Sequence, residues 1–236
     1  MATAKSRTPA ATYRFQRHHP ALIAGSCLMT KQKREEPMRV FFPQSEIDGA
    51  CGLHSLCSAL VILDLAKSSA LTEMSRRKHG VPATVWSAFG KTYFTGINPP
   101  EFVELVKSLD LPIQVTARYS HVEGIDTAAL DWLMHGDLVA VAFESVQNSR
   151  TRHWALGVGV EGSCIARKEL PDTILILDPS ADEPHFGVAN ARLKALPKTS
   201  ARTPNKQLVW AYESPCWPTE QVRLLSAVRF KPEMWS

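Results

Sequence analysis

The feature that most constrains the fold of this chain is an apolar segment that begins at Cys51. Apolar side chains recur there at spacings of three and four residues, which is the period of an α-helix with one buried face. They are Leu53, Leu56, Cys57, Leu60, Val61 and Leu63. The spacing predicts a buried helix from residue 51 to about residue 66, directly after a short turn of small and polar residues.

Two further helices and a series of strands are predicted downstream. Asn98 is expected to cap a helix whose first turn holds Pro99 and Pro100, and another helix is expected over residues 127–135. Strands rich in Val, Ile, Leu and aromatic residues are expected at 113–117, 138–143, 154–160, 173–177, 207–212 and 226–230. Several strands follow one another without a helix between them. We therefore expect an α+β fold, in which N-terminal helices pack on an antiparallel β-sheet.

The charge divides the chain into two parts. Of the 27 Lys and Arg residues, seven lie in residues 1–37, where the only acidic residues are Glu35 and Glu36. We expect residues 1–37 to form a basic, disordered N-terminal extension and residues 38–236 to form one domain. The charges of that domain nearly balance, which argues against a nucleic-acid partner, because proteins that bind duplexes concentrate basic residues on one face.

The cysteines and the hydropathy pattern indicate the compartment. Five cysteines without a Cys-x-x-Cys pair are typical of free thiols in a reducing compartment. They are Cys27, Cys51, Cys57, Cys164 and Cys216. No apolar run reaches the roughly 18 residues of a membrane helix, so no membrane association is expected. The sequence predicts a cytoplasmic location, with export through the N-terminal extension as the alternative, and nothing in it predicts an oligomeric state.

Cys51 is the best candidate for a reactive group. A cysteine at a helix start meets unpaired backbone N–H groups and the positive end of the helix dipole, which favour a thiolate. The same N–H groups can donate to an oxyanion after the thiolate attacks a carbonyl carbon, and the amide of Gln44 can be a second donor. Two neighbours on the helix, His54 and Cys57, are expected to pack rather than to react.

Two residues at strand ends complete a predicted site. His153 opens a predicted strand, where a rigid sheet can aim its ring, and imidazole is suited to hold and deliver a proton. Asp178 closes the next predicted strand, so it can orient His153 if the two strands are neighbours. Because no tight Cys/His pairing occurs, neither a metal nor a cofactor is expected.

Taken together, these motifs resemble those of the C39 and C39-like peptidases of the papain-like superfamily. In that family a glutamine precedes a Cys-Gly at a helix start, a His-Trp pair opens a glycine-containing strand, and an Asp-Pro closes the next strand. The matching residues are Gln44, Cys51-Gly52, His153-Trp154 with Gly157 and Gly159, and Asp178-Pro179. The resemblance covers about residues 40–182 and departs from the family in a loop at 162–172.

The resemblance implies a papain-like cysteine protease fold and hydrolysis of peptide or isopeptide bonds in a peptide or protein substrate, through a thioester on Cys51. Other acyl transfers at the same Cys-His-Asp site stay open, namely transglutamination, glutamine deamidation and removal of a ubiquitin-like modifier. A non-catalytic, peptide-binding module is the remaining alternative, although retention of both Cys51 and His153 argues against it.

Overall fold

The computed structural model describes residues 12–31, 36–149, 151–197 and 207–233, and strands predominate in it. Strands hold 38% of the residues and helices 25%. The helices of the described residues are α1 (Cys51–Ile62), α2 (Ser68–Thr72), α3 (Gly80–Phe89), α4 (Pro99–Ser108) and α5 (Ile125–Met134). Two short 3₁₀ helices, Met74–Arg76 and Gly90–Thr92, follow α2 and α3. None of the helices in these ranges is both long and apolar enough to cross a membrane.

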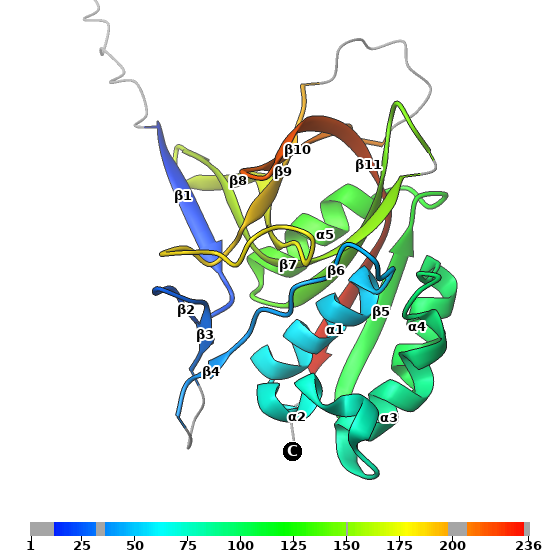
Figure 1. Ribbon diagram of the computed structural model, residues 1–236. Helices are drawn as coiled ribbons and strands as arrows, with labels where there is room; N and C mark the ends of the chain where they lie inside the picture. The colour runs from blue at the N-terminus through cyan, green and yellow to red at the C-terminus, as the bar shows by residue number, and fades with distance from the viewer. Residues whose placement is uncertain (1–11, 32–35, 150, 198–206, 234–236) are drawn as a thin grey trace, which may run out of the picture.

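The described residues form two sheets, a large one and a small one (Figure 1). The strands of the large sheet are β1 (Thr12–His18), β5 (Ile113–Tyr119), β6 (Leu138–Ser145), β7 (Arg152–Ile165), β8 (Lys168–Leu177), β9 (Ala191–Ala195), β10 (Trp210–Ser214) and β11 (Trp217–Pro232). Those of the small sheet are β2 (Leu22–Ile23), β3 (Met29–Thr30) and β4 (Met38–Arg39). In the large sheet, β6 to β11 form a closed six-stranded antiparallel barrel, because β11 pairs with β6 and β7 pairs with β8.

The closed barrel overturns the expected fold class. We expected a papain-like α+β fold with N-terminal helices on an antiparallel sheet, and that prediction is wrong, since the chain is mostly β and its main sheet closes on itself. Closure depends on β9, which the sequence did not predict, and on the 16-residue β11, which pairs with β5, β6 and β10. A bulge between Leu224 and Ser226 interrupts the pairing of β11 with β6, as bulges do where strands bend. The expected antiparallel pairing is confirmed.

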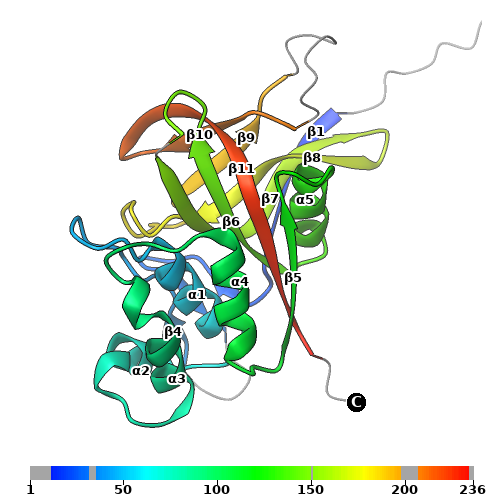
Figure 2. The same ribbon diagram turned by 90° about the vertical axis from the view of Figure 1, so that its right-hand side faces the viewer.

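Two hydrophobic cores lie on the two faces of the barrel wall. Side chains that point inward, among them Trp210 and Leu224, pack with α5 in one core. Alternate residues of the same strands point outward and pack with α1, α3 and α4 in the other. Figure 2 shows these three helices gathered on one side of β6, with α5 apart from them. The outer core therefore fixes α1, and with it Cys51, against β7.

Part of the N-terminal extension belongs to the fold. We expected residues 1–37 to lie outside the domain, but β1 pairs with β7 along its whole length, from Thr12↔Ile165 to His18↔Gly159. A Cβ atom on Gly159 would lie 2.3 Å from the carbonyl oxygen of Arg17, so only glycine lets β1 approach this closely. Residues 1–11 and 32–35 of the expected extension lie outside the described residues.

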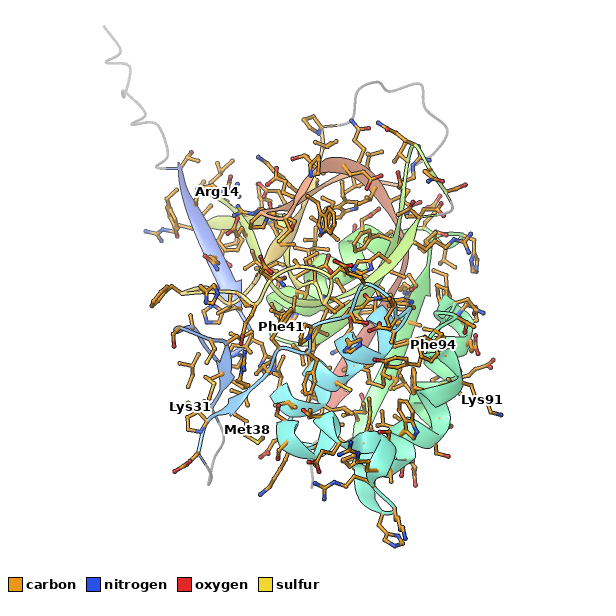
Figure 3. The ribbon with its side chains drawn as sticks, viewed as in Figure 1. Arg14, Lys31, Met38, Phe41, Lys91 and Phe94 are labelled. Carbon is orange, nitrogen blue, oxygen red and sulfur yellow. The ribbon has the colours of Figure 1, made fainter. Side chains whose placement is uncertain are left out.

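The segment 162–172, which we expected to be an extra loop, is also part of the large sheet. It is the far half of the β7–β8 hairpin, in which Gly162 pairs with both Phe15 and Pro171. An ion pair of 2.6 Å joins Arg14, labelled in Figure 3, to Asp172 across this hairpin. The hairpin and β1 therefore extend the large sheet beyond the barrel.

Deleting residues 1–18 is expected to lower the melting temperature, because it removes β1 and exposes the backbone of β7 to solvent. For a domain of this size each kcal/mol lost lowers the melting temperature by about 2–4 °C. Thermal unfolding followed by circular dichroism measures the change. Deletion of residues 1–11, which leaves β1 in place, is the matched control. Equal melting temperatures for the two truncated proteins would contradict the role given to β1.

Candidate active site

Gly52 allows the start of α1 to approach the start of β7. Cys51 is the first residue of α1 and is nearly buried. A Cβ atom on Gly52 would lie 2.9 Å from the side chain of Ile97 and 3.4 Å from the indole of Trp154. Glycine at this position therefore lets Cys51 come close to His153, the residue before Trp154.

Trp154 holds the beginning of β7 in place. Its Nε1 donates a hydrogen bond of 3.0 Å to the carbonyl oxygen of Ile97, and its ring stacks on Phe102 with centroids 4.3 Å apart. These contacts tie β7 to the segment before α4 and to α4 itself. These contacts therefore fix the backbone next to His153, as an aimed imidazole requires.

His153 and Asp178 form an ion pair in which the carboxylate is buried and the imidazole is partly exposed. Nε2 of His153 lies 2.7 Å from Oδ1 of Asp178, whose side chain is only 1% exposed. The same Oδ1 accepts a bond of 2.8 Å from the backbone N–H of Ser180, and Oδ2 accepts one of 2.7 Å from the hydroxyl of Tyr212. With its carboxylate held from three sides, Asp178 can fix the orientation of the His153 ring.

The pKa values show the charge on this pair. Burial alone would lower the pKa of His153, but the charge and hydrogen bond of Asp178 and the interaction with Cys51 raise it to about 10. Burial would raise the pKa of Asp178, but His153, Tyr212 and Ser180 outweigh burial and lower it. At neutral pH the pair is an imidazolium and a carboxylate. Because Nε2 faces Asp178, Nδ1 is the ring nitrogen left for Cys51.

Gln44 lies where the loop before α1 meets the loop after β8. Its backbone N–H donates to the carbonyl oxygen of Pro179 at 2.7 Å, and its Oε1 accepts from the hydroxyl of Ser180 at 3.0 Å. Its Nε2 donates to the carbonyl oxygen of Asp48 at 2.6 Å. The second N–H of this amide has no acceptor among the described residues, so the amide keeps a donor for a ligand.

The four residues predicted from the sequence thus come from separate elements that the fold brings to one end of the barrel. Cys51 and Gln44 come from α1 and the loop before it, His153 from the start of β7, and Asp178 from the end of β8. The polar contacts described above join Gln44 to the Asp178 loop, Asp178 to His153, and His153 to Cys51.

Three residues that support the site were not predicted from the sequence. Tyr212 supports the carboxylate of Asp178, and Asn190 holds its backbone, accepting from the N–H of Asp178 at 2.7 Å and donating to its carbonyl oxygen at 2.8 Å. The third, Asp48, organises the loop before Cys51. Tyr212 and Asn190 lie in a part of the chain without a recognisable motif, and only the position of Asp48 beside Cys51 offered a signal.

His54 and Cys57, which follow Cys51 on α1, have no role in the proposed site. Nε2 of His54 lies 3.6 Å from Oδ1 of Asp48, away from the His153 pair. Burial raises the pKa of Cys57 to about 12, which keeps this thiol protonated. Within the described ranges, no three His, Cys, Asp or Glu side chains are grouped so that they could hold a metal ion.

Comparisons with known proteins do not assign a family to this chain. No protein-family model matches the chain, and a search of curated proteins finds no match.

Proposed function

We propose that this chain is a cysteine hydrolase that cleaves peptide or isopeptide bonds, with Cys51 as nucleophile and His153 as general acid and base. The observation that carries the proposal is His153, which pairs with the Asp178 carboxylate at 2.7 Å and interacts with Cys51, with a pKa raised to about 10. A charged imidazole beside a cysteine at a helix start favours the thiolate, which is the reactive form. The order of Gln44, Cys51, His153 and Asp178 along the chain, which resembles the C39-like peptidases, supports the same chemistry.

The reaction follows from the protonation states. The thiolate of Cys51 attacks the carbonyl carbon, and the carbonyl electrons move to the oxygen. The backbone N–H of Cys51 and the amide of Gln44 donate to this oxyanion, and losing one such donor typically costs about 100- to 1,000-fold in rate. His153 gives its proton to the leaving nitrogen as the carbon–nitrogen bond breaks, which leaves a thioester. Neutral His153 then takes a proton from water, whose oxygen displaces the sulfur and releases the acid.

One finding supports a cytoplasmic location. All five cysteines, each within the described residues, are free thiols. Free thiols of this number fit a reducing compartment.

Trapping the covalent intermediate tests the proposed function. The wild type is incubated with a pool of unmodified peptides, quenched in acid, and analysed by intact-mass spectrometry and by sequencing of the products. The proposal predicts an acyl group on Cys51 and new peptide amino termini. An acyl group accompanied only by cross-linked or deamidated peptides would assign the transfer or deamidation outcome, and no acyl group on Cys51 with any peptide would contradict the proposal.

Changing Asp178 to asparagine is expected to move the alkaline limb of the pH–activity profile to lower pH. The carboxylate raises the pKa of His153. Without the carboxylate, His153 loses its proton at a pH nearer the ordinary imidazole pKa of about 6.5. Turnover falls but stays measurable, because Asp178 orients His153 and does not touch the substrate. Measurement of kcat/KM against pH shows the shift.

The matched control for that experiment is Tyr212→Phe, which removes one hydrogen bond to Asp178 and keeps its charge. Its alkaline limb should move much less than that of Asp178→Asn. An alkaline limb that stays at the wild-type position in Asp178→Asn would show that Asp178 does not set the protonation of His153.

A further inference from the structure

The loop of residues 44–50, which leads into α1, is built around one buried carboxylate. The side chain of Asp48 is 1% exposed. Its Oδ2 accepts from the backbone N–H and from the hydroxyl of Ser45, each at 2.8 Å, and its Oδ1 accepts from the backbone N–H of Ala50 at 3.0 Å. The carboxylate therefore bridges the beginning of the loop and the residue that precedes Cys51.

The main chain of the same residue holds the Gln44 amide. The carbonyl oxygen of Asp48 accepts from Nε2 of Gln44 at 2.6 Å. Nitrogen rather than oxygen of the amide must face this carbonyl, because two oxygens at that distance would repel each other. Since its side chain is bonded on both sides, Asp48 cannot turn this peptide without breaking the bonds to Ser45 and Ala50.

Gly49 brings the loop into close contact with the segment 93–96. The N–H of Gly49 donates to the carbonyl oxygen of Tyr93 at 2.8 Å. A Cβ atom on Gly49 would lie 2.8 Å from the nitrogen of Gly96 and 2.9 Å from the carbonyl oxygen of Phe94, which Figure 3 labels. The loop is thus fixed from within by Asp48 and from outside by backbone that only glycine can approach.

The surroundings of Asp48 keep it ionised. Burial would raise its pKa, but hydrogen bonds from Ala50 and Ser45 outweigh burial and lower it. Two more groups face it, His54 at 3.6 Å and the Tyr93 hydroxyl at 3.5 Å. Burial lowers the pKa of His54, so this ring is neutral at neutral pH. A buried carboxylate depends mainly on its hydrogen bonds, so the loop keeps the shape that supplies them.

We propose that Asp48 is a positioning residue, which holds the loop so that the Gln44 amide and the Cys51 backbone N–H face the same oxyanion. This inference rests on the proposed hydrolase function and names a residue that acts through Gln44 rather than on the substrate. It separates two tasks within the site. His153 and Asp178 hold and deliver the proton, whereas Asp48 controls the donors that receive the carbonyl oxygen.

Asp48→Asn tests the proposal, because asparagine keeps the size of the side chain but turns one acceptor into a donor. We expect kcat to fall by about 100-fold, the lower end of the cost of losing an oxyanion donor, with little change in KM. Alkylation of Cys51 by iodoacetamide should keep its wild-type rate, because displacement at a saturated carbon builds no oxyanion. Glu46→Gln, an exposed change of charge in the same loop, is the matched control and should leave kcat unchanged.

A double-mutant cycle shows whether Asp48 acts through Gln44. If it does, Gln44→Ala alone lowers kcat about as much as the double variant Gln44→Ala/Asp48→Asn, and the effects are not additive. Ser45→Ala removes one hydrogen bond to the carboxylate and should cause a smaller loss of kcat with an intact fold. An unchanged kcat in Asp48→Asn, additive losses in the cycle, or alkylation that falls in step with kcat would each overturn the positioning role.

Cys51→Ala, measured in parallel, separates failure of this inference from failure of the proposed function. Full activity in Cys51→Ala would overturn both. Loss of activity in Cys51→Ala together with full activity in Asp48→Asn would overturn the inference alone.

Discussion

Replacing Cys51 with alanine is expected to abolish peptide hydrolysis, with a loss of about 10⁴- to 10⁶-fold in kcat, because removing the nucleophile of a catalytic triad costs rates of this order. The fold should persist, since alanine differs from cysteine by one sulfur atom and Cys51 lies at the first position of α1. Steady-state kinetics and thermal unfolding of the purified variant check both expectations.

Cys57→Ala is the matched control for the nucleophile. It changes a cysteine on the same helix, but one that is fully buried and whose pKa of about 12 keeps it a thiol. This variant should keep wild-type kcat and lose about 1 kcal/mol of stability, as substitutions in a core typically do. Loss of activity in Cys57→Ala with retention in Cys51→Ala would reverse the assignment.

Replacing His153 with alanine is expected to damage both activity and stability. Removing a general acid–base typically costs about 100- to 10,000-fold in rate. The change also leaves Asp178 with a 1% exposed carboxylate and no cationic partner. Breaking a fully buried ion pair by removing one member costs about 3–5 kcal/mol. His153 is partly exposed, so we expect the free energy of unfolding to fall by less than this. Urea denaturation and kinetics measure the two losses.

A second substitution separates the two effects. In the double variant His153→Ala/Asp178→Asn the unpaired charge is gone, so stability should return in part, while activity should stay at the level of His153→Ala. The N–H of Ser180 can still donate to the Oδ1 of asparagine, and the amide NH2, which replaces Oδ2, can donate to the hydroxyl oxygen of Tyr212. A double variant less stable than His153→Ala would show that the cost does not come from an unpaired carboxylate.

Local signals in the sequence predicted the local parts of the fold. The apolar spacing after Cys51 gave a helix that begins at that residue, although α1 ends at Ile62 rather than near residue 66. The expected cap is confirmed, because the side chain of Asn98 accepts from the N–H of Glu101 at 3.0 Å. Such features depend on residues within one turn of each other, so a single sequence contains them.

The barrel depends on contacts between distant residues, which composition does not encode. The ladder that closes it joins Val222 to Ser145 and Phe230 to Leu138. The sequence predicts a tail at residues 12–18 because the first 37 residues are basic and show no sustained periodicity. In the structure nearly all side chains of β1 are exposed, and the strand is held by backbone pairing across Gly159. The periodicity of the sequence therefore does not predict this strand.

The same distinction applies to the candidate site. Cys51, His153 and Asp178 stand at element boundaries, where a reactive residue type beside a turn or a strand end is visible in the sequence. Tyr212 reaches Asp178 from 34 residues away, and its position gives no such signal. Supporting residues are therefore harder to predict than the groups that they support.

The most direct test of the account is the reactivity of Cys51 as a function of pH. The wild type and His153→Ala are alkylated with iodoacetamide over about pH 5 to 9, a range that includes the ordinary thiol pKa of about 8.5. Mass spectrometry of the digested protein gives the rate at each cysteine, and the exposed Cys216 serves as an internal comparison. The account predicts that wild-type Cys51 reacts at lower pH than Cys216, and that the profile of Cys51 moves to higher pH in His153→Ala. Identical profiles for Cys51 in the two proteins would contradict the catalytic pair.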